Sequence, residues 1–177
     1  MPTIMTHALV GVTFAQLARP HLAAPARAVL PVAAFCAILP DADLFGIPGI
    51  DLGLGLSHRG VTHSVAFALA LGVGVAYVVK RRLPAVRMVA LTALLFLITV
   101  SHGLLDAMTN GGPGVALAAP FSAERYFLPW RPIEVSPIGV RFFSVRGLSV
   151  MVSEIVWVWL PLGLVAASMV WRRRKAA

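Results

Sequence analysis

The sequence is poor in charge, and above all in acids. Charged residues make up 12% of its 177 residues, and 7 acidic side chains stand against 15 basic ones. A soluble globular domain is about a quarter charged, so this composition argues against one. The chain also has a single cysteine, Cys36, in an apolar run. An intramolecular disulfide is therefore excluded, and Cys36 is interpreted as a small buried residue.

Motifs of several enzyme classes are missing as well. The chain has no Gly-x-Ser-x-Gly nucleophile motif and no Cys–His pair in view. It also lacks a phosphate-binding glycine loop, since GGPG at 111–114 is a turn signal that ends an apolar segment. No histidine follows His102. The sequence therefore has no obvious nucleophile motif.

Long apolar stretches are what the sequence has in abundance. Hydrophobic residues make up 59% of the chain, and five apolar segments stand out, at about 5–18, 28–39, 63–79, 88–108 and 148–171. A bilayer core needs about 20 helical residues; the last two segments reach this length, and the third does if it begins at His63. The first two are shorter, so they either cross as tilted helices or form a hairpin that only partly crosses. We therefore expect an all-α fold: an integral membrane helical bundle of four to five helices, forming a single domain over 1–177 with a long outer loop at 109–147.

Basic residues predict the orientation in the membrane. Ten of the fifteen lie after the first, third and fifth segments, where there is no acid: Arg19, Arg27, Lys80, Arg81, Arg82, Arg87, Arg172, Arg173, Arg174 and Lys175. The positive-inside rule places these joints in the cytoplasm, with the N-terminus outside and the C-terminus inside. The start of the chain lacks the basic stretch of a signal peptide, as an outside N-terminus requires. The arginine-rich tail is thus interpreted as a topology anchor, and no nucleic-acid partner is expected.

The same orientation gathers titratable side chains at the outer ends of the segments. In order along the chain these are His7, Asp41, Asp43, His58, His63, His102 and Asp106. His102 and Asp106 are four residues apart and share one helix face. His7 is followed by the small residues Gly11 and Ala15, and His63 by Ala66, Ala70 and Gly74, which suggests that both histidines point into the bundle with a packing stripe. Ser57 or Thr62 is expected to cap the third helix.

Each of these fragments also has a purely structural interpretation, as a hydrogen-bonded His–Asp pair or as acids at a helix end. Together they bring imidazoles and carboxylates from four helices to one layer. That ligand mixture suits zinc or manganese, so we predict one or two divalent metal ions. Glu154, in the first outer turns of the last segment, is a further possible oxygen ligand.

Arginines on the outer side are candidates for binding a phosphate. Guanidinium groups bind phosphate with two parallel hydrogen bonds, and Arg59, Arg125 and Arg131 all lie on the outer side. An equally good interpretation is contact with lipid headgroups or loop solvation. The aromatic residues of the outer loop would form a lid or rest on the lipid interface.

Four stretches carry a family resemblance: THALVG, LPDAD, SHRGVTHS and SHGLLDAMTN. In order and spacing they resemble the YdjM-like family of bacterial inner-membrane proteins, classed as membrane-bound metal-dependent hydrolases. One departure is Leu44, where relatives often have a histidine. That family is distantly similar to zinc-dependent phospholipase C and the single-strand-specific zinc nucleases. The resemblance implies zinc ligands at Asp41 or Asp43, His63, His102 and Asp106, with His7 beside a second ion.

The functional hypothesis follows from both lines of reasoning. A metal-activated water would cleave a phosphoester of a lipid or lipid-linked phosphate at the outer face of the bacterial inner membrane. Asp43 would act as the general base, and membrane lipid and a phosphate-containing substrate would be the partners. Two alternatives stay open: an ion transporter, because intramembrane Asp and His build ion pathways, and a non-enzymatic metal-binding membrane protein.

Overall fold

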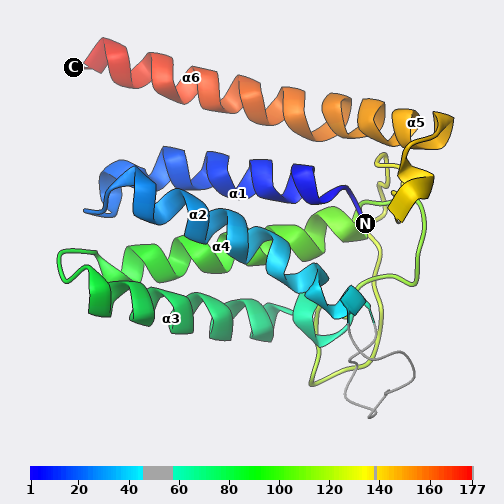
Figure 1. The fold of residues 1–177 in the computed structure, drawn as a ribbon, viewed down its shortest axis with the longest axis horizontal. Helices are drawn as coiled ribbons and strands as arrows, with labels where there is room; N and C mark the ends of the chain where they lie inside the picture. Colours follow the sequence, from blue (N-terminus) through cyan, green and yellow to red (C-terminus); the bar gives the residue numbers. More distant parts are fainter. Residues whose placement is uncertain (46–57, 138, 177) are drawn as a thin grey trace.

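The computed structural model describes residues 1–45, 58–137 and 139–176, and its regular structure is helical. Within these ranges the β pairing amounts to two isolated bridges, Thr109–Ile133 and Val115–Tyr126. Figure 1 shows the long helices lying side by side, with the connections collected at the two ends of the bundle. The predicted all-α class is confirmed.

The first helical hairpin consists of α1 (Ile4–Ala18) and α2 (Ala26–Ile38), joined through the short turn η1 (Arg19–His21). The helix α1 begins where the Thr3 side chain accepts a hydrogen bond from the N–H of Thr6. Gly11 lets the two helices approach closely, because a Cβ at this position would lie 2.7 Å from the Cβ of Ala37. His7, Gly11 and Ala15 are all buried, which confirms the packing stripe expected on this helix.

The second hairpin consists of α3 (Val65–Arg82) and α4 (Met88–Ala107). The cap of α3 is Ser64, whose side chain accepts from the N–H of Phe67. Thr62 instead donates to Asp43, so the expectation that Thr62 caps this helix is wrong; Ser57, the other candidate, lies outside the described residues. His63 belongs to the short turn η3 (Val61–His63) and precedes the helix.

That turn changes which face of α3 is buried. The buried small residues are Ala68, Gly72 and Ala76, whereas a Cβ added at Gly74 of the predicted stripe would meet no neighbour within 4 Å. The prediction of a stripe through Ala66, Ala70 and Gly74 was therefore wrong. Its physical reason is that His63 lies outside the helix, so helical periodicity cannot be counted from it.

The C-terminal segment 145–176 forms one continuous helix that runs along α1 (Figure 1). It consists of α5 (Val145–Glu154), the wider π-helical segment η5 (Ile155–Trp159) and α6 (Leu160–Ala176). Pro161 explains the irregular segment, because proline has no N–H to continue the regular hydrogen-bond ladder. The connection between α4 and α5 includes one short turn, η4 (Gly139–Phe142).

Two helices in the described part of the chain are long and apolar enough to cross a membrane: α4, and the continuous helix Val145–Lys175. The helices α1, α2 and α3 are shorter, with 15, 13 and 18 residues. Large apolar side chains nevertheless point outward from them, including Phe35, Leu69 and Tyr77, each at least half exposed. Water-soluble helices place charge on such faces, so the bundle surface suits lipid.

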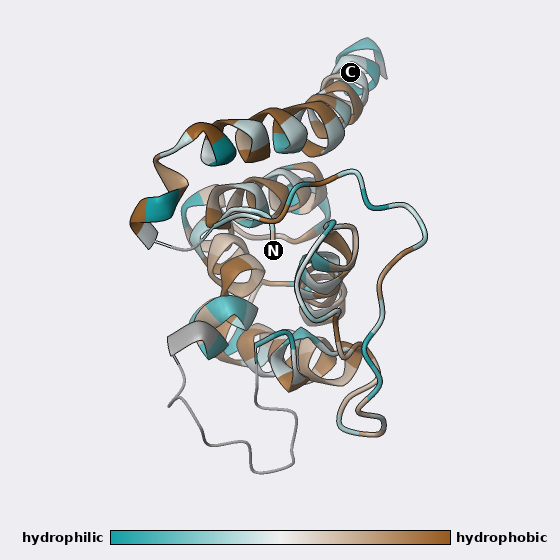
Figure 2. Cartoon of the chain, turned by 90° about the vertical axis from the view of Figure 1, so that its right-hand side faces the viewer, coloured by the Kyte–Doolittle hydropathy of each residue, from teal (hydrophilic) through white to brown (hydrophobic). Residues whose placement is uncertain are grey.

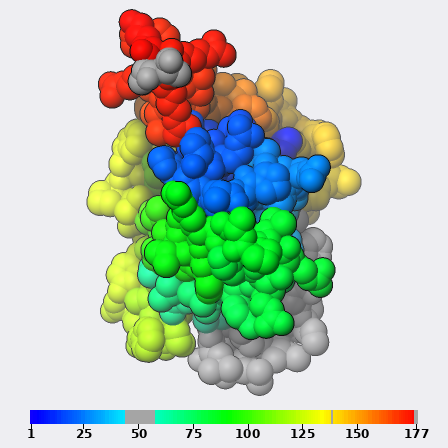
Figure 3. Space-filling view, turned by 90° about the vertical axis from the view of Figure 1, so that its left-hand side faces the viewer, coloured from blue at the N-terminus to red at the C-terminus, as the bar shows by residue number. Residues whose placement is uncertain are grey.

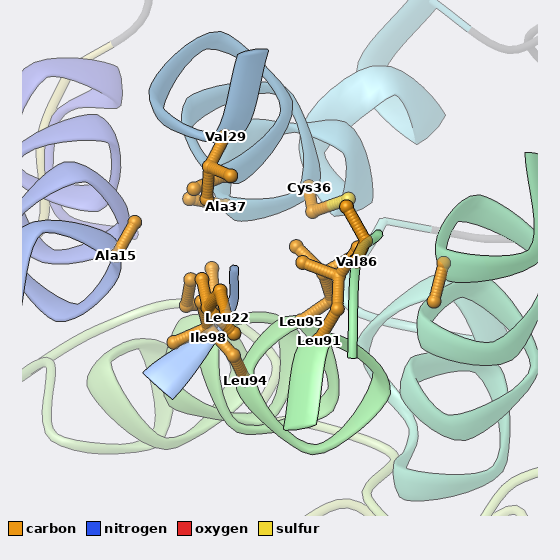
Figure 4. Close-up of a cluster of buried hydrophobic side chains, with 12 residues drawn as sticks. Ala15, Leu22, Val29, Cys36, Ala37, Val86, Leu91, Leu94, Leu95 and Ile98 are labelled. Carbon is orange, nitrogen blue, oxygen red and sulfur yellow. The ribbon is translucent and has the colours of Figure 1, made fainter. Parts of the chain in front are cut away.

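The two ends of the bundle differ in character. Between the ends lies an apolar core to which all four helices α1, α2, α3 and α4 contribute. It includes Leu22, Val29, Leu91, Leu95 and Ile98 (Figure 4). Turns η1 and 83–87 and the C-terminal segment lie at one end, seen face-on in Figure 3. The N-terminus, the 3₁₀ turn η2 (Leu39–Phe45), η3 and the long connection lie at the other end (Figure 2). The predicted site residues belong to this second end.

Candidate metal centre

Three elements deliver four side chains to one buried cluster at the end of the bundle where the N-terminus lies. Asp41 comes from η2, His63 from η3, and His102 and Asp106 from the last turns of α4. One ligand atom from each of the four lies within 4.8 Å of every other, and all four residues are buried. We call these four residues the inner cluster. They have the number and kind of donor atoms that hold a metal ion.

The imidazole of His102 has a defined orientation. Its Nδ1 lies 2.7 Å from the carbonyl oxygen of Ala37, and because a carbonyl only accepts, Nδ1 carries the proton. The lone pair of Nε2 therefore points into the cluster, 3.4 Å from Oδ1 of Asp41 and 3.2 Å from Nε2 of His63. A backbone carbonyl behind a histidine is the arrangement that fixes metal-ligating imidazoles.

The two carboxylates of the inner cluster lack ordinary partners. Asp41 is 5% exposed and Asp106 is fully buried. None of their four oxygens has a hydrogen-bond partner among the described residues, although Arg59 forms an ion pair with Asp106. Buried carboxylates in this state are costly. A bound cation would remove that cost.

His7 adjoins the inner cluster from α1. Its ring stacks on that of His102 with centroids 3.7 Å apart, and its Nε2 lies 3.6 Å from Oδ1 of Asp106. The side chain is buried, and neither ring nitrogen has a hydrogen-bond partner in the described ranges. His7 thus offers a further nitrogen donor at the edge of the cluster.

Asp43 and His58 lie on the opposite side of the His63 ring. Oδ1 of Asp43 is 2.8 Å from Nδ1 of His58. Its Oδ2 accepts from the Thr62 hydroxyl at 2.8 Å and from the N–H of Arg59 at 3.2 Å, and lies 3.3 Å from Nδ1 of His63. Asp43, His58 and His63 form a second group with metal-ligand spacing. In contrast to Asp41 and Asp106, Asp43 has hydrogen-bond donors on both oxygens.

The charge state of this second group follows from the same contacts. Burial alone would lower the pKa of His63, but the nearby carboxylates of Asp41 and Asp43 outweigh burial and raise the pKa to about 9. Burial would likewise raise the pKa of Asp43, yet the bonds from His58 and His63 hold that pKa well below its usual range. Asp43 is therefore a carboxylate at neutral pH.

Arg59 is buried in the centre and held on every side. Its Nε lies 3.0 Å from Oδ2 of Asp106, while Nη1 donates to the Gly111 carbonyl at 3.0 Å and Nη2 to the Thr109 hydroxyl at 2.9 Å. The side chain is 1% exposed. Gly112 makes room for it, since a Cβ there would lie 2.8 Å from Nη1. The GGPG turn after α4 thus forms a cradle for Arg59.

The other two predicted phosphate-binding arginines lie in the long connection. Nη1 of Arg125 donates to the carbonyls of His58, Arg59 and Gly114 at 3.1 to 3.4 Å, so Arg125 ties this connection to the histidine-containing segment. The guanidinium of Arg131 stacks over the ring of Phe127 at 4.8 Å, and its side chain is exposed.

Glu154 belongs to a different network. Its carboxylate accepts from the Thr3 N–H at 2.5 Å, the Thr3 hydroxyl at 2.6 Å and the Thr6 hydroxyl. Thr6 in turn accepts from the indole N–H of Trp159 at 2.7 Å. This buried carboxylate therefore joins the C-terminal helix to the start of α1, where the helix dipole favours an anion. Glu154 is not among the described residues that have metal-ligand spacing, and its oxygens serve this junction.

Several groups that orient the site residues could not be predicted from the spacing of residues in the sequence. The Ala37 carbonyl and the hydroxyls of Thr62 and Thr109 orient His102, Asp43 and Arg59. A carbonyl is common to every residue, so Ala37 could not have been singled out. Thr109 has the one readable cue, since it follows Asp106 by three residues and donates to the Asp106 carbonyl at 2.7 Å.

Fold and site together define a helical membrane protein with a buried histidine and carboxylate cluster at one end of its bundle. The chain belongs to the family of the YdjM inner membrane protein, whose family model matches residues 1–177. It is also similar to inner membrane protein YbcI of Escherichia coli (strain K12), with 37% identity over 177 residues that cover 99% of this chain and 100% of the relative. No solved structure matches. The family predicted from the four motifs is confirmed, and with it the assignment to the inner membrane.

Proposed function

We propose that this protein is a membrane-bound, metal-dependent hydrolase that cleaves a phosphoester of a lipid or lipid-linked phosphate. The observation that carries the proposal is the pair of buried carboxylates, Asp41 and Asp106, whose oxygens lack hydrogen-bond partners in the described structure. They lie beside two imidazole nitrogens at 3.4 to 3.6 Å. A divalent cation satisfies both sets of atoms at once.

The donor set favours zinc, with manganese as the second choice. Two carboxylates and two imidazoles suit the tetrahedral preference of zinc, and manganese accepts the same atoms with more ligands. When bound, such an ion supplies a Lewis acid for a phosphoryl oxygen and lowers the pKa of water. The protein's part is to bring four donors together in a buried site and to fix the orientation of each ring.

Each residue of the centre has a role that its contacts support. Asp41 and Asp106 supply negative charge, and His63 and His102 supply nitrogen donors. Asp43 accepts hydrogen bonds on both oxygens, two of them from its neighbours Thr62 and Arg59. These contacts suit a carboxylate that orients His63 better than the general base that the sequence suggested, and we assign Asp43 the orienting role.

The surroundings of the centre support an apolar substrate. A cavity of about 280 Å³ lies at the start of α1, lined chiefly by apolar side chains that include Met1, Ile4, Met5, Phe142 and Phe143. Because His7 lies one turn further along α1, the cavity and the inner cluster share this end of the bundle. A lipid tail fits such a lining. Arg131, which is exposed on the long connection, remains the candidate for contact with a phosphate headgroup.

The orientation of the chain is part of the proposal. We place five crossings in the membrane, with the N-terminus and the metal centre outside and the C-terminus in the cytoplasm. Support comes from ten of the fifteen basic residues, which lie in or next to the turns after α1 and α3 and in the C-terminal segment. All three are at the end of the bundle opposite the inner cluster (Figure 1).

A direct assay tests the proposed activity. Detergent-purified protein loaded with Zn²⁺ or Mn²⁺ is incubated with phosphatidic acid in mixed micelles, and with p-nitrophenyl phosphate as a water-soluble comparison, while released phosphate is measured. We expect release from the lipid, lost in His102→Ala and kept in His21→Ala, since His21 is an exposed residue at the far end of the bundle. Bound metal with no release from any phosphoester tested would contradict the hydrolase while sparing the metal centre.

One observation favours a second candidate, a metal-binding membrane protein without enzymatic activity. All four residues of the inner cluster are buried, and four donors are enough to close a tetrahedral zinc shell. An ion transporter is less well supported, because Thr99 is the one polar side chain among the buried residues that lie between the inner cluster and the basic end in the described ranges. Ion flux into proteoliposomes would separate a transporter from the other two.

A further inference from the structure

Arg59 is the one buried arginine or lysine in direct contact with the inner cluster in the described part of the chain. Its Nε lies 3.0 Å from Oδ2 of Asp106, with both side chains almost fully buried. Three groups with fixed positions hold it there: the Asp106 carboxylate, the Gly111 carbonyl and the Thr109 hydroxyl. A guanidinium tied down in this way cannot swing out to meet a substrate. Its charge is a permanent part of the centre.

The charge balance around Arg59 points to one divalent ion. The inner cluster and the neighbouring group contain three carboxylates, Asp41, Asp43 and Asp106. Metal-ligating imidazoles are neutral, so with Arg59 these groups carry a net charge of minus two. One divalent cation neutralises them. A second would leave two uncompensated positive charges in a buried site, which is strongly unfavourable.

The hydrogen bonds around the site also indicate one metal ion rather than two. The second group with metal-ligand spacing in the described residues consists of Asp43, His58 and the Nδ1 side of His63. These atoms are already paired with one another, at 2.8 Å between Asp43 and His58 and at 3.0 Å between His63 Nδ1 and the Thr62 hydroxyl. The oxygens of Asp41 and Asp106, in contrast, have no hydrogen bonds within the described ranges. The ring nitrogens of His7 are the other buried atoms without hydrogen bonds in these ranges, and His7 lies against Asp106, a carboxylate that the inner cluster already uses.

We propose that Arg59 takes the place of a second metal ion, so that the centre binds one divalent cation next to a built-in guanidinium. The proposal rests on the metal centre of the proposed function and adds its stoichiometry. In enzymes with two metal ions, the second ion adds positive charge beside the first to stabilise the reacting oxygens. Here Arg59 supplies one positive charge beside Asp106, at a position that the turn 109–112 fixes.

A metal titration tests this inference without relying on activity. Metal-stripped, detergent-purified protein is titrated with Zn²⁺ by calorimetry, and the bound metal is counted by elemental mass spectrometry after desalting. We expect one equivalent in the parent protein, even with a tenfold excess of Zn²⁺. Two tight equivalents would overturn the role of Arg59 while leaving the metal centre intact. No bound zinc or manganese would overturn the proposed function itself.

Two variants separate the charge of Arg59 from its shape. Arg59→Lys keeps the charge and Arg59→Met removes it, while both lose the guanidinium contacts to Thr109 and Gly111. Because a buried positive charge repels the incoming cation, we expect Arg59→Met to bind Zn²⁺ about tenfold more tightly than Arg59→Lys. Thermal unfolding shows whether both variants fold. A Zn²⁺ affinity of Arg59→Met that is equal to or lower than that of Arg59→Lys would contradict the inference. If either variant is unfolded, the number of Zn²⁺ ions bound by the parent protein decides whether the inference holds.

Discussion

The Nε2 atoms of His63 and His102 lie 3.2 Å apart and face each other. His102 uses its other nitrogen on the Ala37 carbonyl, and Nδ1 of His63 lies 3.0 Å from the Thr62 hydroxyl. With Nδ1 on the carbonyl, His102 directs the lone pair of its Nε2 at His63. Because neighbouring carboxylates outweigh burial and raise the pKa of His63 to about 9, Nε2 of His63 carries a proton in the metal-free protein and donates it to this lone pair. A bound cation would take the place of that proton, since metal binding releases protons from its ligands.

The first prediction concerns the members of the inner cluster. His102→Ala and Asp106→Ala each remove one of four donors and should reduce bound metal, measured by elemental mass spectrometry on desalted protein, to less than a tenth of the parent value. His21→Ala is the matched control, because His21 lies in η1 at the far end of the bundle. If both variants fold and keep their metal, the cluster is a hydrogen-bond network and no metal centre.

The second prediction separates the two aspartates of the LPDAD motif. Asp41→Asn removes a carboxylate whose oxygens have no hydrogen bonds in the described structure, and it should abolish tight metal binding. Asp43→Asn should keep the stoichiometry and lower the affinity by about 10- to 100-fold, as changes to groups that orient a metal-ligating histidine do. Competition with a chromophoric chelator measures both. Equal loss in the two variants would show that Asp43 is itself a ligand.

Sequence spacing identified one pair of candidate ligands correctly but could not separate the roles of Asp41 and Asp43. His102 and Asp106 could be paired from spacing alone, because a regular helix places i and i+4 on one face. Asp41 and Asp43 lie in a 3₁₀ turn, whose register relative to His63 depends on packing between elements far apart in the sequence. The sequence predicted that both aspartates lie in the site. It could not show that Asp41 faces Nε2 of His63 whereas Asp43 faces Nδ1.

The partners of the buried charged residues Arg59 and Glu154 could not be predicted from the sequence either. Sequence placed both on the outer side and assigned them to substrate and metal. Their partners are Asp106, Thr109 and Gly111 for Arg59, and Thr3 and Thr6 for Glu154. These contacts join segments about 50 to 150 residues apart, such as Arg59 with Gly111 and Glu154 with Thr3. No local pattern reports them, whereas helix positions and the small residues of α1 follow from local rules.

The third prediction follows from the junction at Glu154. Glu154→Leu leaves the donors of Thr3 and Thr6 buried without an acceptor, which costs about 1–3 kcal/mol for each group. We expect the melting temperature in detergent to fall by at least about 5 °C, with bound metal unchanged. Trp159→Phe, which removes only the indole hydrogen bond to Thr6, should cost less, and Glu134→Gln on the long connection should have little effect.

The result that would contradict this junction is specific. If Glu154→Leu lost its metal while the melting temperature stayed at the parent value, the carboxylate would be a ligand after all. A fall in both quantities is resolved by repeating the metal measurement at a temperature well below the new transition. Metal that returns under those conditions supports the junction.

The last prediction tests the orientation in the membrane. Cys36 is fully buried, so a Cys36→Ala background lets single cysteines report on chosen positions. Ala123 in the long connection and Ala85 in the turn between α3 and α4 are both exposed and lie at opposite ends of the bundle. In intact spheroplasts, a membrane-impermeant maleimide should label Ala123→Cys at once and Ala85→Cys only after permeabilisation. The reverse pattern would place the metal centre on the cytoplasmic side, and the basic turns would then lie outside, against the positive-inside rule. Labelling of both positions in intact spheroplasts would contradict the crossing of α4, since this helix begins three residues after Ala85 and leads to the connection that carries Ala123.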